Sequence, residues 1–145
     1  MKYVSRNMIG LALMLLVSLY VGYASTANAK EDAEMTAIPT NSTDIWKLID
    51  ARVAQLKVTI DSGHLDEVHH QAFAIRDLVA ALPANSTSLP ADLLAKVRGG
   101  VKFVATLAER LDATGDAKDL AGTQQNYAKL AAILASLRSN YSRAK

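Results

Sequence analysis

Four stretches of this chain repeat apolar residues at steps of three and four, and that spacing constrains the fold more than any other feature. The steps match the turn of an α-helix, about 3.6 residues, so each stretch predicts a helix with one apolar face. No stretch alternates apolar and polar residues with the period of two that marks a β-strand. We therefore expect an all-α chain. The four stripes are Ile45, Ile49, Val53, Leu56 and Ile60; Leu65, Val68, Ala72, Ile75, Val79 and Leu82; Leu94, Val97, Val101, Val104, Ala108 and Leu111; and Leu120, Thr123, Tyr127, Leu130, Leu134, Leu137 and Tyr141.

Residues that start or stop helices separate these stretches. Ser42-Thr43-Asp44 offers N-cap side chains to the first helix, and Gly63 is placed to end it in the left-handed conformation that glycine adopts cheaply. Pro83 stops the second helix, Gly115 ends the third and Asp116 caps the fourth. The connections are thus short, long and short, which predicts an antiparallel up-down-up-down four-helix bundle over residues 42–145.

The third predicted helix has two further features, one at its start and one in its middle. Ser88 and Pro90 suit its start. Gly99-Gly100 interrupts its middle, and two interpretations stay open: a close approach or slight kink of the helix, or a notch that admits a ligand.

The first 29 residues have the pattern of an export signal. Lys2 and Arg6 precede an apolar run from Met8 to Val21, and Ala27-Asn28-Ala29 supplies small residues for cleavage. This predicts a signal peptide over residues 1–29 and a periplasmic protein with no membrane segment after cleavage; the alternative is an uncleaved anchor. Residues 30–41 lack periodicity and are expected to form a flexible leader.

Charge and composition exclude several classes of function. The chain has 16 Lys and Arg and 14 Asp and Glu, and since Lys2 and Arg6 lie in the signal peptide, the mature chain carries 14 of each sign. A nucleic-acid binder needs an excess of positive charge, so no nucleic-acid partner is expected. The absence of cysteine excludes disulfides, thiolate metal sites and covalent haem attachment.

Charge is nevertheless unevenly distributed along the mature chain. Residues 90–145 carry 9 basic and 5 acidic residues, whereas residues 30–89 carry 5 and 9. This asymmetry either orients a partner or draws the helices of the bundle together.

Catalytic motifs are missing from the sequence. It contains no G-x-S-x-G, no phosphate-binding glycine loop, no H-E-x-x-H and no cysteine nucleophile. We therefore expect a non-enzymatic protein.

Side chains that could bind a metal are concentrated at the start of the second helix. All three histidines gather there with two acids, as His64, Asp66, Glu67, His69 and His70. Imidazole and carboxylate groups suit divalent Zn, Cu and Ni, so these residues form a candidate metal site. Adjacent helical residues diverge by about 100°, which predicts that His69 points away from His70. A solvated polar helix start and a pH sensor are the alternative interpretations.

Two segments resemble a known family. Leu56-Lys-Val58, and Ala-Ser-Leu-Arg-Ser-Asn-Tyr-Ser ending at Ser142, are similar to the corresponding segments of the cytochrome b562 family of periplasmic four-helix bundles. That resemblance implies haem binding and electron transfer. The family's axial Met aligns with Ile49 and its axial His with Ser142, and neither residue replaces an iron ligand, so ordinary haem ligation is not supported.

These observations together favour a non-enzymatic periplasmic binding or accessory protein, with a divalent transition metal as its candidate ligand. The alternatives are a b562-like haem protein with unusual ligands and a helical interaction module whose partner is an envelope protein.

The exported protein is expected to begin at Lys30, because Ala27 and Ala29 fit the small-residue pockets required for signal cleavage. The intact mass of protein recovered from the periplasm measures this. A mass that retains Met1 to Ala29 would identify a membrane-anchored protein instead.

Overall fold

A computed structural model describes residues 37–143; the predicted signal peptide and most of the predicted leader lie outside these residues. The described part is all-helical, with four α-helices, one short 3₁₀ turn and no strand. The elements are α2 (Ser42–Asp61), η1 (Leu65–Glu67), α3 (Val68–Ala81), α4 (Ala91–Asp116) and α5 (Leu120–Ser142). None of these helices is apolar enough over a sufficient length to cross a membrane.

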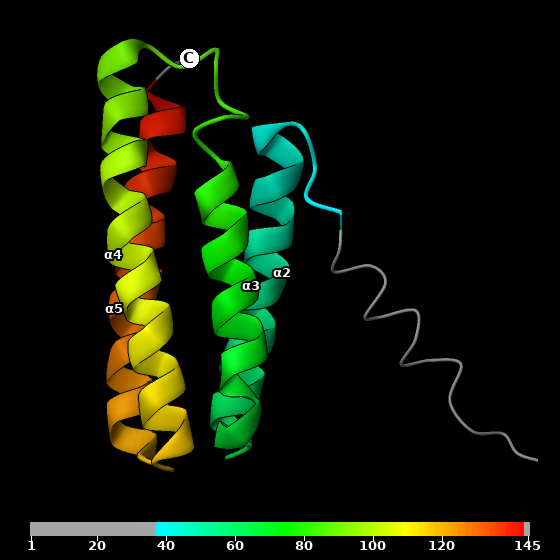
Figure 1. Cartoon of the computed structure of the whole chain (residues 1–145), viewed down its shortest axis with the longest axis vertical. Coiled ribbons are helices and arrows are strands. Elements are labelled where there is room, and N and C mark those ends of the chain that lie inside the picture. Colours follow the sequence, from blue (N-terminus) through cyan, green and yellow to red (C-terminus); the bar gives the residue numbers. More distant parts are fainter. Residues whose placement is uncertain (1–36, 144–145) are drawn as a thin grey trace, which may run out of the picture.

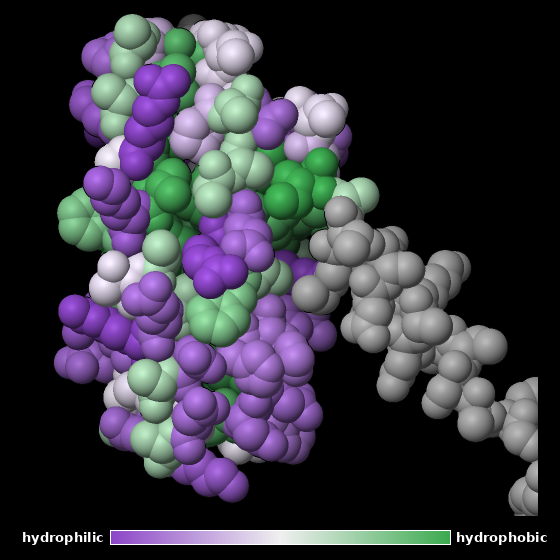
Figure 2. All heavy atoms as spheres, viewed as in Figure 1, coloured by the Kyte–Doolittle hydropathy of each residue, from purple (hydrophilic) through white to green (hydrophobic). Residues whose placement is uncertain are grey.

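The four helices lie side by side with nearly parallel axes (Figure 1). α2 packs on α3, α3 on α4 and α4 on α5, and α5 also touches α2. Their apolar faces meet in one core, and polar side chains cover most of the face shown in Figure 2. The packing is that of a helical bundle.

The predicted stripes supply most of this core. The stripe of the second helix is buried along its whole length, from Leu65 to Leu82. In α4 the apolar face is wider than predicted, because Leu93 and Leu107 are also buried. In α5 the prediction was wrong at Leu120, which is 44% exposed at the helix start, while Asn126 is buried.

The predicted end of the first helix is confirmed. Gly63 has a φ of 78°, and its N–H donates to the carbonyl of Ile60, while the N–H of His64 donates to Thr59. This pair of hydrogen bonds forms a Schellman motif. The start differs by one residue: Asn41 caps α2 by accepting from the N–H of Asp44, at 2.8 Å.

The second predicted helix is divided. Leu65–Glu67 winds as a 3₁₀ turn before the α-helix begins at Val68, an arrangement that is frequent at helix N-termini. The helix after the long loop starts at Ala91 with Pro90 as its N-cap residue, and no side chain caps it, so the predicted cap by Ser88 was wrong.

The turn between α4 and α5 also differs from the prediction. Gly115 does not end the helix; Lys118 takes the left-handed conformation, with a φ of 53°, and Asp119 rather than Asp116 caps α5 through Gly122. Gly115 is needed for a different reason. A Cβ at that position would lie 2.6 Å from the carbonyl oxygen of Leu65, so only glycine lets η1 approach α4 this closely.

Aromatic and charged side chains join the opposite end of the bundle. The rings of Trp46 in α2 and Tyr141 in α5 meet edge to face with centroids 5.6 Å apart. Arg138 lies over the Trp46 ring at 4.4 Å and pairs with Asp50 at 2.6 Å. Burial raises the pKa of the Tyr141 hydroxyl, and its 2.8 Å hydrogen bond with the buried Ser86 opposes that shift. These contacts attach α5 to α2 and to the long loop.

Replacing Gly115 by Ala is expected to destabilise the protein by about 1 to 3 kcal/mol, because the added methyl group collides with the backbone of Leu65. The matched control is Gly99→Ala: no atom lies within 4 Å of its added Cβ, so helix propensity should raise stability by about 0.5 to 1 kcal/mol. Urea unfolding measures both changes. A stabilised Gly115→Ala variant would contradict the proposed close approach.

Candidate functional site

The residues of the candidate metal site lie at the junction of α2 and α3. His64 precedes η1, Asp66 and Glu67 lie within it, and His69 and His70 begin α3. All are exposed except His69, which is partly buried. The sequence therefore correctly placed them in one short segment, but the segment is a 3₁₀ turn followed by a helix rather than one continuous helix.

The local contacts of the histidines differ from the sequence prediction. Nδ1 of His69 lies 2.9 Å from the carbonyl oxygen of Asp66, and Nδ1 of His64 lies 3.3 Å from the hydroxyl of Ser62. The rings of His69 and His70 touch, with centroids 3.8 Å apart, so the expectation that His69 points away was wrong. The Cβ atoms of neighbouring residues diverge on a helix, but imidazole arms are long enough to turn back toward each other.

Within residues 37–143, no three His, Cys, Asp or Glu side chains are gathered so that they could hold one metal ion. An ion at this junction therefore requires His64 or an acid of η1 to move toward His70. The metal site stays a prediction of the sequence.

The aromatic residues separate into packed and exposed members. Trp46 is buried, and Tyr127 and Phe73 are partly buried against the core. Phe103 in α4 is different, because 62% of its surface is exposed. Exposed apolar side chains mark a binding surface when they belong to a contiguous apolar patch, so the neighbours of Phe103 decide its meaning.

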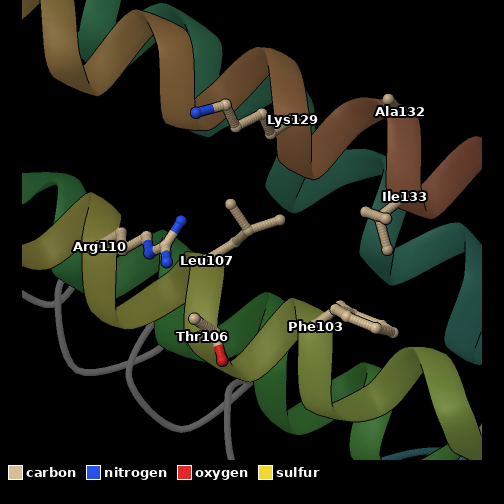
Figure 3. A pocket seen from close by; sticks show the side chains of 7 residues that line it. All are labelled: Phe103, Thr106, Leu107, Arg110, Lys129, Ala132 and Ile133. Atoms are coloured by element: carbon tan, nitrogen blue, oxygen red, sulfur yellow. The ribbon is translucent and has the colours of Figure 1, made fainter.

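Phe103 lies in a groove between α4 and α5 (Figure 3). One part of the groove has a volume of about 530 Å³ and a second part about 360 Å³, and both parts are lined by Phe103 and Ile133. The two parts therefore adjoin at these two side chains. The first part is also lined by Thr106, Leu107, Arg110, Lys129 and Ala132. The second part is also lined by Lys96, Gly99, Gly100, Ser136, Leu137, Ser139, Asn140 and Arg143.

The floor of the groove is apolar. Leu107 extends from α4 into the space between the helices, with Ile133 of α5 facing it (Figure 3). Leu107 and Leu137 also belong to the bundle core, so they are held firmly from below. The groove thus has a rigid base and an exposed aromatic side chain.

The two glycines of α4 have separate roles here. A Cβ at Gly100 would collide with the side chain of Leu137, so Gly100 permits the close approach of α5. Gly99 has open space above it and lines the groove. The interpretation as close packing holds for Gly100, whereas ligand entry at Gly99 stays a prediction.

All ionisable lining residues of the groove are cations. Arg110 and Lys129 lie at one end, and their side chains appear on the same side in Figure 3. Lys96 and Arg143 line the other part. Among the described residues, only Lys96 of these four has an ion-pair partner, Asp92 at 3.9 Å. The groove therefore favours an anionic ligand.

Sequence reasoning did not find this site. Its signals were present in the glycine pair, the basic surplus of residues 90–145 and the single aromatic residue off the apolar stripe of α4. The α5 half of the groove gives no separate signal, because Ile133 and Ala132 resemble ordinary helix residues. Only the packing of α5 beside α4 brings the halves together.

The residues at the two positions aligned with axial haem ligands do not fit a haem iron. Ile49 is 1% exposed in the core and carries no donor atom, and Ser142 lies exposed at the last turn of α5. A serine hydroxyl is not among the side chains that hold haem iron in the major haem protein classes.

Comparison of the chain with protein-family models, curated proteins and solved structures found no match.

Zn²⁺ binding at the junction of α2 and α3 is expected to depend more on His70 than on His69, because His70 is exposed, whereas His69 is partly buried and has only Nε2 free of the contact with the Asp66 carbonyl oxygen. Binding should slow amide exchange over residues 64–70, since the donors must move together. Acidification should weaken it, because imidazole must be neutral to bind a metal. Calorimetric titration of the wild type, His70→Ala and His69→Ala measures the affinities, and equal affinities in all three would contradict the site.

Proposed function

We propose that this chain is a non-enzymatic binding protein of the bacterial periplasm, and that it holds its ligand in the groove between α4 and α5. The observation that carries the proposal is the 62% exposed Phe103 above a rigid apolar floor in a groove whose ionisable lining residues are all basic. A concave apolar surface with a few charged groups at its edges commonly marks a binding site.

The proposal includes an antiparallel up-down-up-down topology. Contacts between helix ends support it. The start of α2 meets the end of α5 through Trp46 and Tyr141, and the end of α4 meets the start of the second helical segment where Gly115 lies against Leu65. Such contacts arise when neighbouring helices of the bundle run in opposite directions.

The chemistry of the lining supports binding rather than catalysis. Thr106, Ser136 and Ser139 supply hydroxyl groups, but the lining offers no carboxylate or imidazole beside them to act as a general base. The cations can attract and orient an anion without changing it chemically. Export to the periplasm rests on the signal-peptide pattern of the sequence.

An anionic apolar dye, 8-anilinonaphthalene-1-sulfonate, tests the groove directly. We expect the folded mature protein to bind the dye with a blue-shifted rise in fluorescence, and Phe103→Ser to weaken binding at least fivefold. The matched control is Val58→Ser, which removes an apolar side chain that is 66% exposed on α2, away from the groove. It should leave dye binding unchanged. Equal effects of the two substitutions, or no binding by the wild type, would refute the groove as a binding site.

A further inference from the structure

The cations of the groove are regularly placed along both helices. Lys96 and Arg110 are fourteen residues apart on α4, and Lys129 of α5 is fourteen residues from Arg143, the C-cap residue of that helix. Fourteen residues make nearly four helical turns, so both members of each pair lie on one side of their helix. At about 1.5 Å per residue, the two ends of the groove are separated by roughly 21 Å.

The apolar residues lie between these charged ends. Phe103 is seven residues from both Lys96 and Arg110. Ile133 and Leu137 lie between Lys129 and Arg143 on the other wall. The groove therefore has an apolar centre between two pairs of cations, and these pairs lie about four helical turns apart.

We propose that this groove docks an amphipathic helix of a partner protein whose apolar stripe is flanked by carboxylates at both ends. This inference rests on the proposed function and specifies its ligand. A long groove that is open to solvent along its length suits a helix laid into it, whereas sites for small molecules usually enclose most of their ligand. Charge complementarity at both ends selects an acidic helix rather than a basic one.

The shape of the groove suits apolar side chains at helical spacing. Phe103 projects from α4, and the open space above Gly99 leaves room one turn earlier for a large side chain of the partner. A helix meets such a surface through residues at i, i+3 or i+4, and i+7. These anchors supply most of the affinity, while the exposed charges set orientation and the rate of association.

Synthetic peptides provide the test. The probe is an eighteen-residue helical peptide with a leucine stripe and two glutamates near each end; the matched peptide carries lysines in place of the glutamates. Fluorescence anisotropy with the mature chain should show at least tenfold tighter binding of the glutamate peptide. Raising the salt from 50 to 500 mM should reduce that preference severalfold, because it screens the end charges.

Charge reversal within the protein locates the interaction. Arg110→Glu combined with Lys129→Glu is expected to weaken binding of the glutamate peptide at least tenfold. The control, Arg98→Glu with Lys102→Glu, makes the same change in net charge at two exposed residues of α4 that do not line the groove. It should weaken binding less than threefold. Circular dichroism confirms that each variant remains helical.

The other outcomes each overturn the proposal. Equal binding of the two peptides, or equal losses of affinity in the two double variants, would show that the groove does not recognise the charges at the ends of the peptide. Binding to phosphatidylglycerol vesicles without peptide binding would identify a lipid surface as the ligand. A dimer in sedimentation that Phe103→Ser dissociates would identify a second copy of the chain as the occupant. If the dye still requires Phe103 while neither peptide binds, the acidic-helix proposal fails and the proposed binding function stands.

Discussion

The rest of this bundle depends on the burial of its four apolar stripes in one core. A fully buried leucine, isoleucine or valine contributes about 1.5 to 3 kcal/mol, whereas an exposed ion pair contributes at most about 1 kcal/mol. The five ion pairs among the described residues are all at least partly exposed, so they adjust the structure rather than hold it together. The core fixes which face of each helix is free, and the groove is built on the free faces of α4 and α5.

The ends of the helices show how packing overrides local preference. Gly63 takes the left-handed conformation that suits glycine, but the next turn of this kind uses Lys118, which pays a conformational cost for it. Gly115 lies three residues earlier, inside the helix, where η1 presses on it and leaves no room for a Cβ. The position that needs glycine most is therefore inside a helix.

Thr123 and Asn126 of α5 are buried where α4 supplies hydrogen-bond partners for their side chains. Thr123 donates to the hydroxyl of Thr114 at 3.0 Å, and the amide of Asn126 reaches the carbonyl oxygen of Arg110 at 3.3 Å. These hydrogen bonds form at only one alignment of α4 and α5, so they fix the register of α5 against α4. That register decides which α5 residues face Phe103 and brings Lys129 to the same end of the groove as Arg110.

The sequence by itself determined the all-helical class, most of the core and the end of the first helix, because apolar spacing and glycine conformation are local properties that a folded environment seldom reverses. It also gathered the histidines at one junction, although not their ring directions, which depend on side-chain rotation. Only the tertiary structure decided that Gly115 accommodates η1, that Asp119 caps α5, and that Phe103, Ile133 and four cations form one groove. The physical reason is that each of these features joins residues from two elements, and the distance between elements is set by packing that no single stretch of sequence records.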